Sequence, residues 1–165
     1  MRISVVIIAV FLANMAIAEL QFPPLDADDL NGRAVSLPQD LPGDPTIVFI
    51  AYKRNQQPSI NAWVARLGLQ ERGGAAWAEL PVVGRGAALF RNFIDNGMRS
   101  GITSTAMRGR TITIYSSQRA VNRALGIDGR DQIYTALVGR GGQVHVLIKG
   151  DVTEDKIARL RAAYP

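Results

Sequence analysis

The sequence contains no cysteine. Thiol redox chemistry and catalysis by a thiol nucleophile both need a thiolate, so both are excluded. Histidine occurs once, at His145, so a zinc or copper centre lacks its usual ligands. Lysine occurs only at positions 53, 149 and 156, and the net charge of +5 therefore comes almost wholly from arginine. These absences exclude several enzyme classes before any motif is considered.

Long hydrophobic runs are also scarce, and the first residues carry the main one. Arg2 precedes the apolar stretch Ile3 to Leu12, and Ala16-Ile17-Ala18 forms an A-x-A cleavage site. The stretch is too short for a comfortable membrane span, and no later segment approaches a spanning length. We expect residues 1–18 to be a signal peptide and residues 19–165 to be a domain in the periplasm or another extracytoplasmic space. An uncleaved N-terminal anchor is the alternative.

The rest of the chain has the composition of one globular domain, with 47% hydrophobic and 20% charged residues. A hairpin is predicted around the Asn31-Gly32 turn, within Leu25 to Leu41. Further strands are predicted at Thr46–Ala51, Glu79–Val83, Thr111–Tyr115, Ile133–Val138 and Gln143–Ile148. Helices are predicted from Pro58, over Gly86–Met98, after Ser116 or Ser117, and after Thr153.

This order predicts an α/β fold with a mixed central sheet, helices on both faces and an N-terminal β-hairpin extension. Ile60, Trp63 and Val64 share one face of the first helix and should point inward. In the second helix the residues expected to point inward are Leu89, Phe90, Phe93 and Ile94.

The same order resembles the thioredoxin-like superfamily, in its peroxiredoxin and thiol-disulfide branch. Three stretches carry the likeness: Leu30 to Gly43, the strand and loop that begin at Ile47, and the hairpin Ile133 to Gly142. The resemblance covers most of the mature chain and implies a single thioredoxin-like domain.

The chain departs from that superfamily at the redox site. Gln56-Gln57-Pro58-Ser59 looks like Cys-x-Pro-Cys with both thiols replaced, and a peroxiredoxin alignment instead puts Pro58 at the peroxidatic position. Tyr134 stands where thioredoxins often have a cis-proline, so the preceding peptide bond is expected to be trans. The resemblance therefore implies the fold without its redox activity.

The middle of the chain is also similar to the assembly-factor family of the mitochondrial ATP synthase membrane sector, which is thioredoxin-like without requiring a redox pair. The matching pieces are the strand Ile47–Ala51, the Gln57-Pro58 helix start with Trp63, the stretch Phe90 to Ile94 and the strand Tyr134 to Val138.

Other catalytic or ligand-binding motifs are weak. His145 lies between two valines of a predicted strand, on the opposite face, with no triad pattern nearby. Asp26 to Asp29 lacks the later ligand of a calcium loop and is interpreted as a solvated turn. Gly84-Arg85-Gly86 lacks the third glycine of a dinucleotide-binding loop. We expect no metal and no cofactor.

The candidate site is the loop that follows the first central strand. Ligands bind beyond the carboxyl ends of strands in open α/β sheets, which points to Lys53, Arg54, Asn55, Gln56 and Gln57. The resemblance to thioredoxin-like proteins implies that Tyr134, just before the final hairpin, lies beside this loop as an aromatic anchor. We expect an exported, redox-inactive binding or assembly module whose partner is a protein, acidic or membrane-associated, and not a nucleic acid. A relic site with satisfied polar groups and an enzyme with non-thiol chemistry on the same face are the alternatives.

Arginine is concentrated in the middle of the chain. Between Leu80 and Ile127 the only acid is Asp95, against seven arginines at positions 85, 91, 99, 108, 110, 119 and 123. This distribution indicates either a surface for an anionic partner or a scattered solvated surface.

Export can be tested directly. We predict cleavage after Ala18, so the protein recovered from its host should begin at Glu19 when its intact mass is measured. Recovery of the full-length chain in the membrane fraction would instead establish the N-terminal segment as an anchor.

Overall fold

The computed structural model describes residues 20–115 and 118–164; the predicted signal peptide and the predicted Ser116 or Ser117 helix cap lie outside these ranges. The strands are β1 (Leu25–Asp29), β2 (Ala34–Leu37), β3 (Thr46–Ala51), β4 (Trp77–Pro81), β5 (Ile112–Thr113), β6 (Tyr134–Val138) and β7 (Val144–Lys149). The α-helices are α1 (Gln57–Arg66), α2 (Arg91–Gly101), α3 (Thr105–Arg110), α4 (Gln118–Ala124) and α5 (Glu154–Ala162). Two 3-10 helices, η1 (Arg54–Gln56) and η2 (Arg85–Phe90), precede α1 and α2.

The central sheet has the strand order β4-β3-β6-β7. Only the β3–β4 pair is parallel, and β6 and β7 join as antiparallel strands. A second sheet, β2-β1-β5, contains the predicted N-terminal hairpin, whose turn places Gly32 at a φ of 85°. The mixed sheet and the hairpin extension were both predicted.

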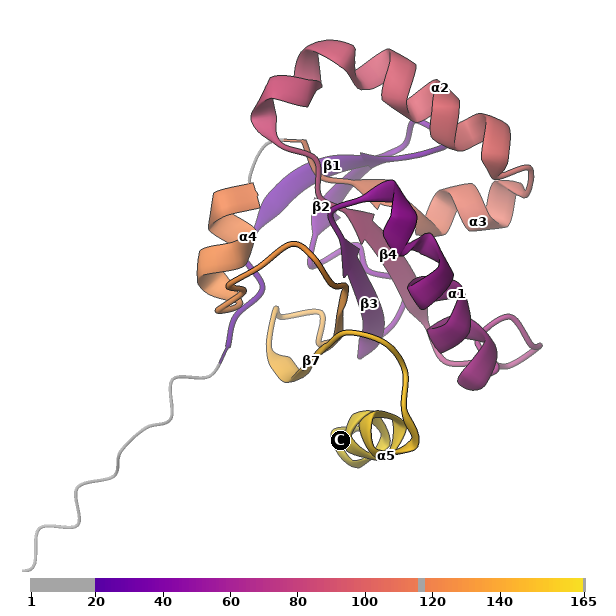
Figure 1. The fold of residues 1–165 in the computed structure, drawn as a ribbon, viewed down its shortest axis with the longest axis vertical. Helices are drawn as coiled ribbons and strands as arrows, with labels where there is room; N and C mark the ends of the chain where they lie inside the picture. Colours follow the sequence, from indigo (N-terminus) through magenta and orange to yellow (C-terminus); the bar gives the residue numbers. More distant parts are fainter. Residues whose placement is uncertain (1–19, 116–117, 165) are drawn as a thin grey trace, which may run out of the picture.

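Strand β3 is fully buried, because both faces of the central sheet are covered. Ile47 and Phe49 pack with α1 and α5 on one face. Val48 and Ile50 pack with the hairpin and α4 on the other. A continuous apolar run is what such a strand requires. Figure 1 shows the helices placed around the sheet, with α2 and α5 at opposite ends of the molecule.

The predicted strand boundaries differ from the structure most at β4 and β5. Strand β4 begins at Trp77, two residues before the predicted start, because Trp77 is buried against Phe49 with the two rings 6.1 Å apart. Strand β5 is shorter than predicted and pairs antiparallel with β1, with isolated bridges to β4. The predicted solvated turn over Asp26–Asp29 is wrong: these residues lie in β1, and Asp29 is buried.

The predicted second helix is wrong in its boundaries and in the face it buries. It is divided into η2 and α2, and α3 follows where no element was predicted. Leu89, Phe90 and Phe93, expected to point inward, are exposed by 89%, 64% and 80%. Ile94, also expected to point inward, is part-buried. The charged residues of α2 face the domain, because β1 and Tyr115 offer them partners: Arg91 pairs with Asp28 at 2.9 Å, and Asp95 accepts a hydrogen bond from Tyr115.

Most of the arginines between Leu80 and Ile127 make contacts within the domain. Arg99 donates to the Leu30 carbonyl, and Arg108 donates to the Ile102 and Arg99 carbonyls. Arg110 lies over the Trp77 ring at 5.3 Å. Arg119 and Arg123 on α4 are exposed. A surface for an anionic partner could therefore include Arg119 and Arg123, but not the arginines that are bonded within the domain.

The opposite positions of Trp63 and Phe93 make a stability test. Trp63 is fully buried, and its indole nitrogen donates to the Gly150 carbonyl at 3.1 Å. We predict that Trp63→Ala lowers the free energy of unfolding by about 3–5 kcal/mol. Phe93→Ala should change it by no more than about 0.5 kcal/mol, because an exposed side chain loses little packing. Urea unfolding curves of dilute, monomeric protein measure both, and a large loss for Phe93→Ala would show that α2 buries its apolar face within the domain.

Candidate functional site

The candidate loop begins where β3 ends. Ala51 and Pro81 are register partners at the carboxyl ends of the parallel strands β3 and β4. The segment 52–56 and the segment 82–90 therefore leave from the same edge of the sheet (Figure 1). Pro58 is favourable in the first turn of α1, where a missing N–H costs no hydrogen bond. The predicted loop and helix start are confirmed.

Gln56 is a structural residue of this loop. It is 5% exposed, and its side-chain oxygen accepts hydrogen bonds from the backbone N–H groups of Tyr52 and Lys53 at 2.8 and 3.1 Å. Its side-chain nitrogen donates to the Arg130 carbonyl at 2.8 Å. A buried amide with all these bonds made is an internal tether. Gln56 therefore does not contribute to an exposed binding surface, contrary to the sequence-based interpretation.

Tyr134 is also buried, at 4% exposure, and so is not an exposed aromatic anchor. Its hydroxyl donates to Asp128 at 3.2 Å, and the Lys149 ammonium bonds the same carboxylate at 3.1 Å. The hydrogen bond from Lys149, followed by that from Tyr134, lowers the pKa of Asp128. The peptide bond before Tyr134 is trans, as predicted, since the cis bonds of the described chain precede Pro38 and Pro45.

The remaining loop residues divide into two pairs. Lys53 forms an ion pair with Asp131 at 2.6 Å, and Gln57 donates to Asn61 and to Glu79. Arg54 and Asn55 are exposed, and neither side chain has a hydrogen bond or ion pair with another residue of the described ranges. Of these four loop residues, only Arg54 and Asn55 therefore have side-chain polar groups that are not already bonded within the described part of the domain.

Helix α4 lies beside the loop. The Tyr52 hydroxyl donates to Asn122 of α4 at 2.6 Å, and desolvation by burial raises the pKa of that tyrosine. Arg119 and Arg123 are exposed on the same helix. The structure thus brings exposed arginines of α4 to the same end of the sheet as Arg54, which the sequence alone did not indicate.

Glu79 is the one buried carboxyl group near the loop that sequence reasoning missed. It lies on β4 opposite Phe49, and both of its oxygens are 3.3 Å from the Gln57 side-chain nitrogen. Burial raises the pKa of Glu79, and the Gln57 hydrogen bond partly opposes that rise. A single acid within the apolar stretch from Trp77 to Val83 was the available signal.

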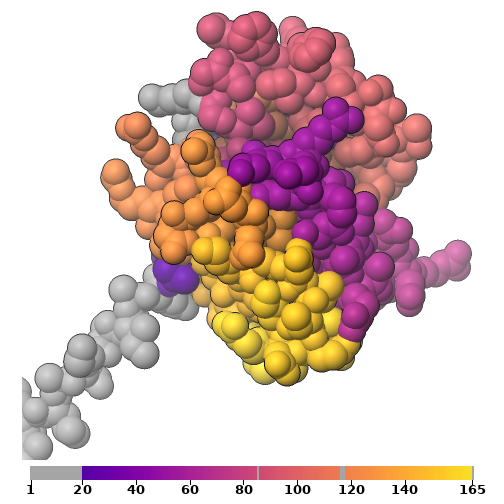
Figure 2. Space-filling view, in the orientation of Figure 1, coloured from indigo at the N-terminus to yellow at the C-terminus, as the bar shows by residue number. Residues whose placement is uncertain are grey.

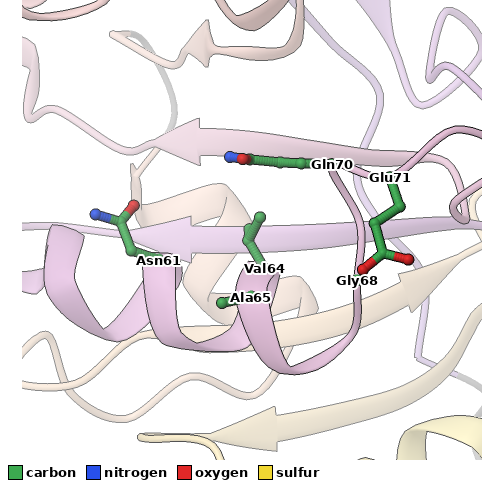
Figure 3. Close-up of a pocket in the computed structure, with 6 residues that line it drawn as sticks. All are labelled: Asn61, Val64, Ala65, Gly68, Gln70 and Glu71. Carbon is green, nitrogen blue, oxygen red and sulfur yellow. The ribbon is translucent and has the colours of Figure 1, made fainter.

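Other features of the described residues do not form a catalytic or metal site. No group of three or more metal-ligating side chains is found in the part of the chain that the structure describes. His145 is exposed, whereas Val144 beside it is buried. A hollow of about 410 Å³ lies along α1, away from the loop, and Figure 3 shows Glu71 as its one charged lining residue. No helix in the described ranges is long and apolar enough to cross a membrane.

Comparison with known proteins shows the fold. No family model matches the sequence, and no curated protein matches it. A candidate electron transfer protein from Aquifex aeolicus VF5 is similar, with a TM-score of 0.61 and 12% identity over 88% of this chain and 97% of its own. BsSco, of the Sco family of cytochrome c oxidase assembly proteins, has a TM-score of 0.57 and 13% identity over 88% and 94%.

The exposed lipoprotein thioredoxin Etrx1 of Streptococcus pneumoniae gives a TM-score of 0.55 and 13% identity, over 86% of this chain and all of its own. The chain therefore has a single-domain thioredoxin-like fold, as its sequence predicted, and its lack of cysteine excludes the thiol chemistry of that fold. The likeness to the ATP synthase assembly factors rests on sequence pieces alone.

Glu79 makes the stability of this site depend on pH. Because burial raises its folded-state pKa, the folded protein retains a proton that the unfolded chain releases. The retained proton adds to the free energy of unfolding. That stabilisation is fully present below the unfolded pKa, near 4.5, and is lost as pH rises through the folded pKa. We predict that Glu79→Gln raises the urea midpoint at neutral pH and flattens the profile above pH 4.5. The exposed control Glu71→Gln should keep the wild-type profile, and an unchanged slope in Glu79→Gln would contradict the assignment.

Proposed function

We propose that this protein is an exported, redox-inactive thioredoxin-like module that binds a protein partner at the edge occupied by the loop 52–56. The observation that carries the proposal is the exposed pair Arg54 and Asn55, held on a 3-10 turn at the carboxyl end of the buried strand β3. Binding sites in open α/β sheets lie at this end, and no thiol remains to perform chemistry there.

The tethers around the turn support this function. Gln56 fixes the turn to residue 130, and Lys53 is paired with Asp131. Arg54 is therefore presented from a fixed backbone, which lowers the conformational entropy lost when a partner orders it. Arginine is among the residues that most often dominate the binding energy of an interface.

Charge indicates the kind of partner. Arg54 and the exposed arginines of α4 lie at one end of the sheet, while the nearby carboxylates of Asp128 and Asp131 are bound to lysines. An acidic protein surface complements such an arrangement. BsSco is described as an assembly protein and Etrx1 as an exposed lipoprotein. These descriptions of structurally similar proteins are consistent with an extracytoplasmic binding role for this chain.

An enzyme with non-thiol chemistry is the second candidate. Glu79 favours it, because a buried carboxyl group with a raised pKa has the properties of a general acid or base. Gln57 lies against this group and is bonded to it. Turnover of a small molecule that is lost in both Glu79→Gln and Arg54→Ala would favour the enzyme over the binding module.

The binding surface is tested by charge reversal. A photo-crosslinker at Asn55, introduced in the native host, identifies the partner, whose affinity is then measured with purified proteins. We predict that Arg54→Glu weakens binding more than Arg159→Glu, an exposed arginine on α5, without lowering the melting temperature. Binding should also weaken with added salt, because exposed charges are screened over about 8–10 Å near physiological ionic strength. Equal effects of the two reversals, or indifference to salt, would leave the loop as a relic of lost chemistry.

A further inference from the structure

The segment η2–α2 is built with its polar side inward. Arg91 reaches Asp28 at 2.9 Å, the Asp95 carboxylate accepts from the Tyr115 hydroxyl at 2.6 Å, and Arg99 donates to the Leu30 carbonyl at 2.6 Å. All the charged residues between positions 86 and 101 are thus bonded to the domain and only part-exposed. Polar contacts hold the segment in place beside the part-buried Ile94 and Met98. The exposed Leu89, Phe90 and Phe93 contribute little to that attachment.

Between positions 86 and 101, the outward side of this segment carries no charged residue. We define the α2 outer face as the exposed residues between positions 86 and 101: Gly86, Ala88, Leu89, Phe90, Asn92, Phe93, Asn96, Gly97, Ser100 and Gly101. Its large members, Leu89, Phe90 and Phe93, are exposed by 89%, 64% and 80%. Figure 2 shows this pink segment forming the upper end of the molecule. Exposed aromatic side chains on a charge-free surface are typical of the centre of a protein interface.

The glycines of α2 also support an interface on this face. Gly97 lies inside the helix, where glycine costs roughly 0.5–1 kcal/mol relative to alanine. A Cβ atom at Gly97 or Gly101 would meet nothing within 4 Å, and neither residue has a positive φ. The isolated chain therefore gives no reason for glycine at these positions. Phe93, Gly97 and Gly101 recur at every fourth residue, so a bulky side chain and two notches lie on one stripe of the helix.

We propose that the α2 outer face is the interface of a symmetric dimer with a second copy of this chain. In an antiparallel α2–α2 pair centred between positions 93 and 97, Phe93 of each copy lies over Gly97 of the other. A two-fold interface must be self-complementary. The stripe meets that condition because it holds both the bulky Phe93 side chain and the notch at Gly97. The proposal does not depend on the function assigned to the loop.

Charge and area both fit a second copy. The protein has a net charge of +5, and the charge-free face lets two copies meet without opposing like charges. An anionic membrane would instead favour unpaired cations bordering the apolar side chains. Arg91 and Arg99 border the α2 outer face, and both are bonded to groups of the domain. Leu89, Phe90 and Phe93 offer roughly 400 Å² per copy if a large side chain buries about 150–250 Å². With the smaller residues of the face, two copies reach the roughly 1,000 Å² that a specific interface needs.

Sedimentation velocity of the exported protein, over about 1–100 μM, tests the dimer. We expect a concentration-dependent species of twice the monomer mass. Phe93→Glu should weaken dimerisation at least about 30-fold, the effect of losing a central aromatic contact. Gly97→Leu should also weaken it while raising the melting temperature of the monomer, because leucine is the better helix former. A purely structural role for Gly97 does not give these opposite signs.

The matched controls are Ala62→Glu, which puts the same charge on the exposed side of α1, and Arg54→Glu in the loop. Both should dimerise like the wild type, so failure of the loop proposal leaves this one standing. A monomer at every concentration, or a dimer indifferent to Phe93→Glu and Gly97→Leu, overturns the proposal. So does a monomer that instead co-sediments with phosphatidylglycerol vesicles in a Phe93-dependent way.

Discussion

The structure depends on the central strand β3, which has no exposed side. Each residue of β3 is buried, and consecutive side chains enter different cores, so the strand joins the α1–α5 layer to the hairpin–α4 layer. Because β3 also pairs with β4 and β6, its position sets the register of the central sheet. The place where β3 ends in turn fixes where the candidate loop leaves the sheet.

The loop shows how a thioredoxin-like fold can keep its geometry without thiols. Gln56, which replaces the first thiol if the loop is matched to Cys-x-Pro-Cys, bonds two backbone N–H groups on one side and the Arg130 carbonyl on the other. The amide thus satisfies buried backbone groups that would otherwise destabilise the turn. The same replacement removes the chemistry and rigidifies the surface on which Arg54 is exposed.

The two proposed surfaces differ in their physical character. The loop edge carries exposed cations and suits an acidic partner that recognises charge and loses affinity in salt. The α2 outer face is uncharged and suits an interface stabilised by burial of apolar area. The segments that carry the two surfaces leave adjacent ends of β3 and β4. A dimer formed through α2 holds two loop sites in one assembly. A partner with two acidic segments would therefore bind it with avidity.

Local sequence determined the features that need only short-range information. The absence of cysteine excluded thiol chemistry, the β-branched run Thr46–Ala51 gave the buried strand, Trp63 lay on the inward face of α1, and Thr153 caps α5 as its side chain predicted. The candidate loop was likewise located correctly. Each of these follows from residue chemistry or from a periodicity within a few residues.

Tertiary structure decided which side of a segment faces the core and which polar groups remain available. Periodicity identifies an apolar stripe at Phe90 and Phe93 but does not say that Asp28 and Leu30, some sixty residues away, bond the opposite side of α2. Gln56, Tyr134 and Glu79 are buried because residues distant in sequence cover them. The free energy of such contacts depends on positions that exist only in the folded chain, so no local pattern encodes it.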